Sequence, residues 1–189
     1  SALIYNTGSF EPLVTIKNCN ISSYIIGIEL YGGGNYLMEN VAISNSEKGL
    51  KLMGSSFLTA KNVTFLDNEY SNVSFELGAQ GDFTNSILWK SEGDFTHGNI
   101  HIEDTEADPD SIATITYSNV YGGWNGEGNI DLNPQFCIPL ENNLTLAETS
   151  PCVGTGVAGS NMGAFDIGCL FPDMALINDN FEVFASTGF

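Results

Sequence analysis

The chain has 189 residues, of which 42% are hydrophobic, and carries 23 Asp and Glu against five Lys and no Arg, for a net charge of −18. The hydrophobic content excludes an intrinsically disordered chain, and no apolar run approaches the roughly 20 residues of a membrane-spanning helix, so membrane insertion is not expected. The negative charge argues against nucleic acid as a partner, and it suits cation binding or, more simply, solubility in saline surroundings.

A repeat of 22 to 23 residues runs through the first half of the chain. Asn18, Asn40, Asn62 and Asn85 each lie in a short segment where apolar and polar residues alternate. Alternation predicts strands, and no stretch has the pattern of a long amphipathic helix. The repeated segments are 16–21, 38–43, 60–65 and 83–88, with a fifth copy at 115–120. A fixed period favours a coil with one repeat per turn, because each strand then stacks on its counterpart about 4.8 Å away.

A second series of strands accompanies the first. Its members are residues 27–30, 49–52 and 73–76, and Ile100-His101-Ile102 is expected to continue it. Residues 2–5 resemble residues 28–31, one turn earlier in the coil. We therefore expect an all-β parallel β-helix of about five to six turns. No capping element precedes residue 2, so we expect the solenoid to be truncated at its N-terminal end, with further turns upstream in a longer parent protein.

Equal spacing also predicts which residues share a position on successive turns. Aliphatic ladders should fill the interior, and the ladder of Asn18, Asn40, Asn62 and Asn85 is expected to point inward and bond to the backbone at a bend. Outside, Lys17, Glu39 and Lys61 share one position, and Glu29 and Lys51 share another. Neighbouring opposite charges stabilise strand pairing modestly, so these residues are interpreted as fixing the register and not as a binding site.

The four cysteines follow no zinc-binding spacing, and only two His are present, so a zinc site is not expected. Cys19 occupies an apolar repeat position and is expected to be a buried free thiol. Cys137, Cys152 and Cys169 crowd the C-terminal third, where one disulfide is expected in an oxidising compartment. The odd count leaves the pairing open.

The run from Ile115 to Asp131 is followed by Asn133-Pro134-Gln135-Phe136, Ser150-Pro151-Cys152 and residues 163–169. Together with the repeats, this block resembles the C-terminal portion of bacterial extracellular proteins with a pectate-lyase-like, right-handed parallel β-helix. The resemblance spans residues 11–170 and implies a right-handed coil in a secreted or cell-surface protein. It divides the chain into β-helix turns at 1–136, a closing segment at 137–170 and a tail or linker at 171–189.

The acidic loop at residues 103–110 is the best candidate for a cation site. Asp104, Glu106, Asp108 and Asp110 stand at alternate positions, from which carboxylates converge on one Ca²⁺ ion when a loop curls. The loop is not an EF-hand, because it lacks the Gly at its sixth position and the Glu at its twelfth. A merely solvated loop is the alternative.

Catalytic residues are not evident from the pattern. A lyase of this fold needs a basic residue beside Ca²⁺-binding carboxylates, and the Lys residues are isolated apart from the charge ladders. A glycosidase needs carboxylates at a defined separation, and none are recognised as neighbours. The candidate acids are Glu29, Glu76, Asp82, Glu92, Asp94 and Glu103.

Aromatic and glycine-rich segments remain. The run 122–129 lacks the Lys and the helix of a phosphate loop, and it is interpreted as a bend in which Trp124 covers the core. Aromatic side chains that could stack on sugars are Tyr31, Tyr36, Tyr70, Trp89 and Phe95.

The leading hypothesis is a non-catalytic structural or adhesive segment that binds a polysaccharide or another cell-surface component. Self-association through the solenoid ends is also expected, since an uncapped end exposes unpaired backbone groups. The alternative is a polysaccharide lyase or a glycoside hydrolase.

Overall fold

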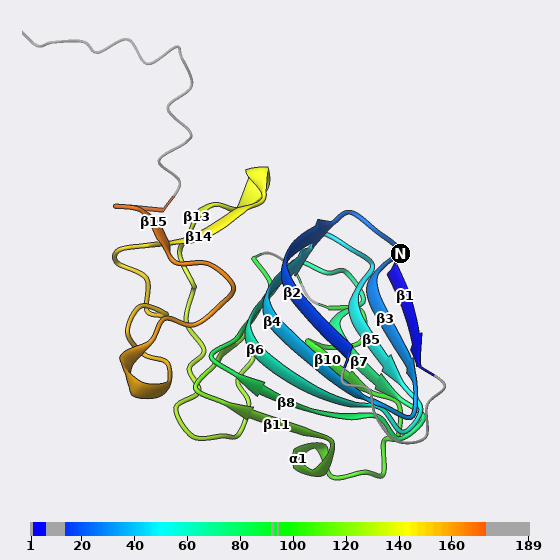
Figure 1. The fold of residues 1–189 in the computed structure, drawn as a ribbon. Coiled ribbons are helices and arrows are strands. Elements are labelled where there is room, and N and C mark those ends of the chain that lie inside the picture. Colours follow the sequence, from blue (N-terminus) through cyan, green and yellow to red (C-terminus); the bar gives the residue numbers. More distant parts are fainter. Residues whose placement is uncertain (1, 7–13, 92, 94, 173–189) are drawn as a thin grey trace, which may run out of the picture.

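The structure of the protein is a computed structural model that describes residues 2–6, 14–91, 93 and 95–172. The described chain winds into a parallel β-helix, as the repeat predicts, with a smaller closing segment at one side (Figure 1). The tail expected at 171–189 lies outside the described residues from position 173 onward. No helix in the described part of the chain is long and apolar enough to cross a membrane.

Two parallel sheets form the walls of the coil (Figure 1). The five-stranded sheet stacks β1 (Ala2–Asn6), β3 (Ile26–Gly32), β5 (Lys48–Met53), β7 (Ser71–Glu76) and β10 (Ile100–Ile102). The seven-stranded sheet contains β2 (Val14–Ser22), β4 (Asn35–Ser44), β6 (Phe57–Leu66), β8 (Gln80–Thr84), β9 (Ile87–Trp89), β11 (Ala113–Thr116) and β12 (Asn119–Val120). The short helix α1 (Pro109–Ile112) leads into β11.

The strand register confirms most of the sequence alignment. Ala2 pairs with Ile28, as expected for a strand one turn earlier, and Thr116 pairs with Thr84 in the fifth copy. The alignment of the second series was wrong by one residue. Val73 pairs with Leu50 and not with Gly49, because the third turn is one residue longer. This shift places Glu29, Lys51, Ser74 and His101 in one line on the outer face.

The interior is filled by stacked apolar side chains, as predicted. Phe83 packs edge-to-face against both Phe65 and Phe75, with ring centres 6.5 and 6.4 Å apart. Trp124 packs against the same core from the glycine-rich bend, which confirms its expected position. The fully buried aliphatic ladder includes Ile28, Leu30, Leu50, Leu52, Leu58, Val63 and Val73.

The repeated Asn residues stack at one bend, but the prediction that they point inward was wrong. Their φ angles are +54°, +53°, +50° and +52°, a left-handed conformation that Asn tolerates better than most residues. The left-handed residue interrupts the in–out alternation. Glu39 and Asn40 therefore both face outward, while Met38 and Val41 on either side remain in the core. We call Asn18, Asn40, Asn62 and Asn85 the outer Asn ladder.

Other asparagines form the inward amide ladder, which we call the inner Asn ladder: Asn68, Asn72 and Asn99. Asn68 and Asn72 are fully buried. The Asn68 Nδ2 atom donates to Asn72 Oδ1 at 2.7 Å, and Asn72 Nδ2 donates to Asn99 Oδ1 at 2.9 Å. Backbone groups of neighbouring turns take up further amide bonds, so the corner is closed by a buried hydrogen-bonded network.

The closing segment is a separate three-stranded sheet of β13 (Phe136–Ile138), β14 (Asn143–Ala147) and β15 (Ile167–Cys169), with 3₁₀ turns at Pro139–Glu141 and Val157–Gly159. It packs on the β-helix through a second core that joins Leu66 and Ile87 to Leu146 and Met162. Lateral packing of this kind uses side chains on the outside of the coil, so it leaves the inner ladders undisturbed.

The structure decides the pairing of the cysteines. Cys137 and Cys169 form a disulfide that joins β13 to β15. Cys152 is a buried free thiol, and burial raises its pKa to about 11. Cys19 is also free, but it is only partly buried, because it lies on strand β2 at one end of the described stack.

Candidate functional site

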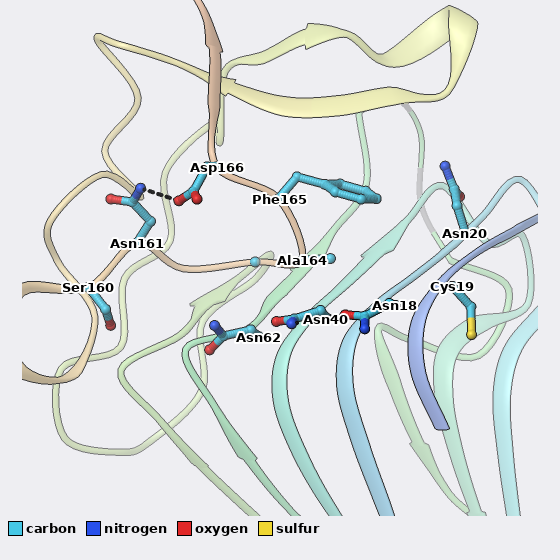
Figure 2. A pocket seen from close by; sticks show the side chains of 11 residues that line it. Asn18, Cys19, Asn20, Asn40, Asn62, Ser160, Asn161, Ala164, Phe165 and Asp166 are labelled. Atoms are coloured by element: carbon cyan, nitrogen blue, oxygen red, sulfur yellow. Dashed lines mark hydrogen bonds between the residues drawn. The ribbon is translucent and has the colours of Figure 1, made fainter. Parts of the chain in front are cut away.

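A groove of about 430 Å³ lies between the outer Asn ladder and the closing segment (Figure 2). Asn62, Asn40 and Asn18 lie in a row along one side, and the ring of Phe165 lies on the other. Cys19 and Asn20 extend the lining beyond Asn18. We call this the Asn groove.

The amides along the groove are partly engaged with one another. Asn40 Nδ2 donates to Asn18 Oδ1 at 3.2 Å, across one turn. A carboxamide has two N–H donors and an oxygen with two lone pairs, so this single bond leaves hydrogen-bonding capacity directed at the groove. Asn18 and Asn40 are exposed and Asn62 is half-buried.

Asn85, the fourth member of the outer Asn ladder, already holds polar groups. Its Nδ2 donates to the Ser160 hydroxyl at 3.0 Å, and its Oδ1 accepts from the Val157 N–H at 2.8 Å. Its backbone carbonyl accepts from Gly163 N–H at 2.7 Å. These bonds fasten the closing segment across one end of the groove.

Two further features hold the wall that carries Phe165. The Ala164 N–H donates to Thr64 Oγ1 at 2.9 Å. Gly163 has a φ of +93°, and a Cβ there would lie 2.7 Å from Ile87 Cδ1, so the close approach requires glycine. The wall is thus fixed against the β-helix by backbone contacts.

The groove is nearly neutral in a chain of net charge −18. Its lining contains one carboxylate, Asp166, and the Asn161 Nδ2 donates to that carboxylate at 3.0 Å (Figure 2). The other polar groups are amides and the Ser160 hydroxyl, apart from the Cys19 thiol. Such a surface can exchange hydrogen bonds with hydroxyl groups while Phe165 covers an apolar face of the same ligand.

The outer face of the five-stranded sheet carries a line of ion pairs. Lys51 Nζ lies 3.5 Å from Glu29 and 3.1 Å from Glu76, and Lys48 Nζ lies 3.4 Å from Glu76. Burial lowers the pKa of Lys51, but the carboxylates of Glu76 and Glu29 together raise it above its usual value. The expected Lys17–Glu39 pair is also present, at 2.5 Å. Charges on successive turns therefore pair as the repeat predicts.

Both histidines of the chain lie beside these ion pairs. The ring of His97 stacks on Tyr70 at 4.0 Å, and the His101 ring centre lies 5.3 Å from that of His97. Lys48 Nζ covers the Tyr70 ring at 4.2 Å. Burial, followed by the neighbouring His97, lowers the pKa of His101.

The repeat predicts that His101 belongs to the second series of strands, but it gives no connection with Lys48, Tyr70 or His97. One signal in the sequence could have indicated this cluster. The chain has only two His, they are four residues apart, and His101 occupies the outward-facing position of the predicted strand 100–102. The loop conformation before β10 could not be read from the repeat, since residues 91–99 belong to an insertion.

The candidate acids serve mainly as structural partners. Glu29 and Glu76 are both held by Lys51, which lies between them. Glu103 Oε2 accepts the Leu77 N–H at 3.1 Å. Asp82 is half-buried on β8, and Glu92 and Asp94 lie outside the described residues.

Two carboxylates of the acidic loop accept hydrogen bonds from backbone N–H groups of the same loop. Asp104 Oδ1 accepts the Glu106 N–H at 3.1 Å, and Asp108 caps α1 by accepting the Asp110 N–H at 3.2 Å. Asp110 Oδ2 accepts from Asn125 Nδ2 at 3.0 Å. Within the described residues, no three His, Cys, Asp or Glu side chains are grouped so as to hold a metal ion. Binding of Ca²⁺ by Asp104, Glu106, Asp108 and Asp110 stays a prediction.

The proposed sugar-stacking aromatics are largely occupied by other side chains. Tyr36 is buried, with its hydroxyl donating to the Tyr31 carbonyl at 3.0 Å. Trp89 and Phe95 both pack edge-on against Tyr121, with ring centres 5.2 and 6.1 Å away. The aromatic ring that faces the Asn groove is instead Phe165, a residue that sequence reasoning did not single out.

Comparison with known proteins agrees with the architecture. The family model described as a right-handed β-helix region matches residues 2–126 of the 189. The chain belongs to the right-handed β-helix family. No curated protein and no solved structure matches it. Because β-helices carry many unrelated functions, the ligand must be argued from the surface itself.

Proposed function

We propose that the protein is a non-catalytic, saccharide-binding β-helix of a secreted or cell-surface bacterial protein, and that the Asn groove is its binding surface. One observation carries this proposal. The side-chain amide of Asn85 binds the Ser160 hydroxyl, and the equivalent amides of Asn18, Asn40 and Asn62 line the groove. A sugar hydroxyl offers the same donor and acceptor as that of serine.

The charge and spacing of the groove favour a neutral, linear polysaccharide. Successive amides are one turn apart, about 4.8 Å, so a polymer with regularly spaced hydroxyls can run along the axis of the coil. The negative charge of the protein repels acidic polymers, and the groove lining offers no cationic side chain to offset that repulsion.

The disulfide supports the proposed location. Cys137–Cys169 is intact in the folded chain, and structural disulfides persist mainly in secreted and cell-surface proteins. A rigid coil with an extended surface supports the proposal of an adhesive or structural role.

The test is a screen against neutral and acidic polysaccharides, with and without Ca²⁺, that scores both binding and product release. We expect binding of a neutral polymer without release of product. Asn40→Gly keeps the left-handed backbone and should raise the Kd about fivefold, the loss of one hydrogen bond of about 1 kcal/mol. Phe165→Ala should weaken binding further.

Asn45→Gly is the matched control, because Asn45 is also left-handed and exposed but lies outside the Asn groove. Equal losses for the substitutions at positions 40 and 45 would contradict the proposal. Release of shorter or unsaturated products would instead favour the alternative, a polysaccharide lyase or glycoside hydrolase.

A further inference from the structure

The chain contains two histidines, and the fold brings both to one place on the outer surface. His97 lies in the loop before β10 and His101 on β10 itself. His97 is exposed and His101 is half-buried, so solvent reaches the pair. Neither residue belongs to the Asn groove.

The separation of the two rings matches that of imidazoles sharing one metal ion. With each nitrogen about 2.0–2.1 Å from a tetrahedral ion, two ligating imidazoles have ring centres about 5 Å apart. The observed distance is 5.3 Å, with the ring planes 72° apart. Stacking on Tyr70, at 4.0 Å and 23° between planes, restricts the orientation of His97.

The surroundings of the pair are compatible with a cation. Glu76 and Glu103 act on His101 with negative charge, and Lys48 is the opposing cation. Lys48 is partly neutralised by its contact with Glu76 at 3.4 Å. Imidazole coordinates metals in its uncharged form, so both rings bind the ion through a free ring nitrogen.

We propose that His97 and His101 form a binding site for a divalent transition metal of the Cu²⁺, Ni²⁺ and Zn²⁺ group, which prefer imidazole ligands. The described residues provide no group of three ligating side chains, so two imidazoles hold the ion and water fills its other positions. The bound ion ties the loop before β10 to the five-stranded sheet. Its binding is moderate and reversible, unlike that of a buried structural zinc.

Calorimetric titration of the full chain at pH 7.5 tests the site, with Cys19→Ser as background because Cys19 is a partly exposed free thiol. We expect one equivalent of metal to bind, with Cu²⁺ tighter than Ni²⁺ or Zn²⁺ and no competition by Ca²⁺. His97→Gln and His101→Gln should each weaken metal binding at least about tenfold. Loss of a residue that only orients a metal ligand already lowers the affinity by about that factor, and loss of the ligand itself should cost no less. Affinity should fall as the pH drops below the usual His pKa of about 6.5.

The matched control replaces Asp104, Glu106, Asp108 and Asp110 by their amides in the same background. This variant should bind the transition metal unchanged and raise its melting temperature with metal as the parent does. Unchanged metal binding in the His97→Gln, His101→Gln double variant would overturn the proposal, and so would loss of binding in the acidic-loop variant. If His101→Gln lowers folding stability, the exposed His97→Gln still decides the question.

Discussion

Asparagine forms two ladders in this β-helix, and they differ in backbone conformation, burial and hydrogen bonding. The outer Asn ladder repeats every 22 to 23 residues, adopts a left-handed backbone and leaves amide groups at the surface. The inner Asn ladder repeats irregularly, is fully buried at Asn68 and Asn72, and its amides are engaged by neighbouring side chains and backbone groups. A regular repeat of Asn therefore reports a backbone requirement, whereas burial of Asn depends on which polar groups meet at a corner.

The largest effect is expected at the inner Asn ladder. Asn68→Ala removes the partner of the Ser46 N–H, the Ile43 carbonyl and the Asn72 Oδ1 atom. Each buried group left unpaired costs about 1–3 kcal/mol, so we expect a loss of about 4 kcal/mol in the free energy of unfolding. Urea unfolding of the variant and the parent measures this. A loss below about 1 kcal/mol would show that water replaces the missing amide.

The disulfide should come next, because it holds the segment that faces the outer Asn ladder. The Cys137–Cys169 bond closes a loop with a sequence separation of 32, which corresponds to about 3.7 kcal/mol of stability. Replacing both cysteines by Ala should lower the melting temperature and weaken saccharide binding. The Cys152→Ala variant, which leaves the disulfide intact, is the control. Unchanged binding after loss of the disulfide would mean that backbone contacts alone hold the groove wall.

The outer Asn ladder should tolerate loss of the amide better than loss of the left-handed conformation. Asn40→Ala keeps the Cβ but loses the polar group that makes the left-handed conformation tolerable for Asn, at a cost of about 1 kcal/mol, whereas Asn40→Gly avoids that strain. We expect Asn40→Ala to be the less stable of the two by this amount in thermal unfolding. If Gly were the more destabilising substitution, the amide and not the backbone would be the reason for Asn at this bend.

A smaller, pH-dependent effect is expected at His101, which lies in line with Glu29 and Lys51 on the outer face of the five-stranded sheet. Its pKa in the folded chain is below 6.5, so the unfolded chain binds more protons between the two pKa values. Folding stability from this group is therefore present above pH 6.5 and is lost as the pH falls through the folded-state pKa. His101→Gln should lose less stability between pH 7 and pH 5 than the parent does. Parallel profiles for the two proteins would assign the whole acid sensitivity to the carboxylates.

The smallest effect concerns the acidic loop. Millimolar Ca²⁺ should raise the melting temperature slightly more than Na⁺ at matched ionic strength, because a divalent ion relieves the repulsion among Asp104, Glu106, Asp108 and Asp110. The four-amide variant should lose this difference. Equal shifts with the two salts would leave the loop as a solvated acidic surface.

The sequence by itself determined the coil, its period and nearly all of its register. Strands in a parallel β-helix stack only when successive turns have matching lengths, so the regular spacing of the Asn residues from Asn18 to Asn85 was enough to predict the architecture. The opposite charges at Lys17 and Glu39, and at Glu29 and Lys51, were predicted for the same reason. The alignment failed by one residue at Val73, where the turn length changes.

Only the tertiary structure decided the direction of the outer amides and the composition of both candidate sites. One left-handed residue reverses the side to which a side chain points, and alternation alone does not reveal it. The residues of the groove wall are far from the outer Asn ladder in sequence: Ser160 contacts Asn85 across a separation of 75 residues. The closing segment has no repeat, so its position on the β-helix could not be predicted from the sequence. The choice of Cys169 as the partner of Cys137, and the meeting of His97 with His101, likewise depend on how irregular segments pack on a regular coil.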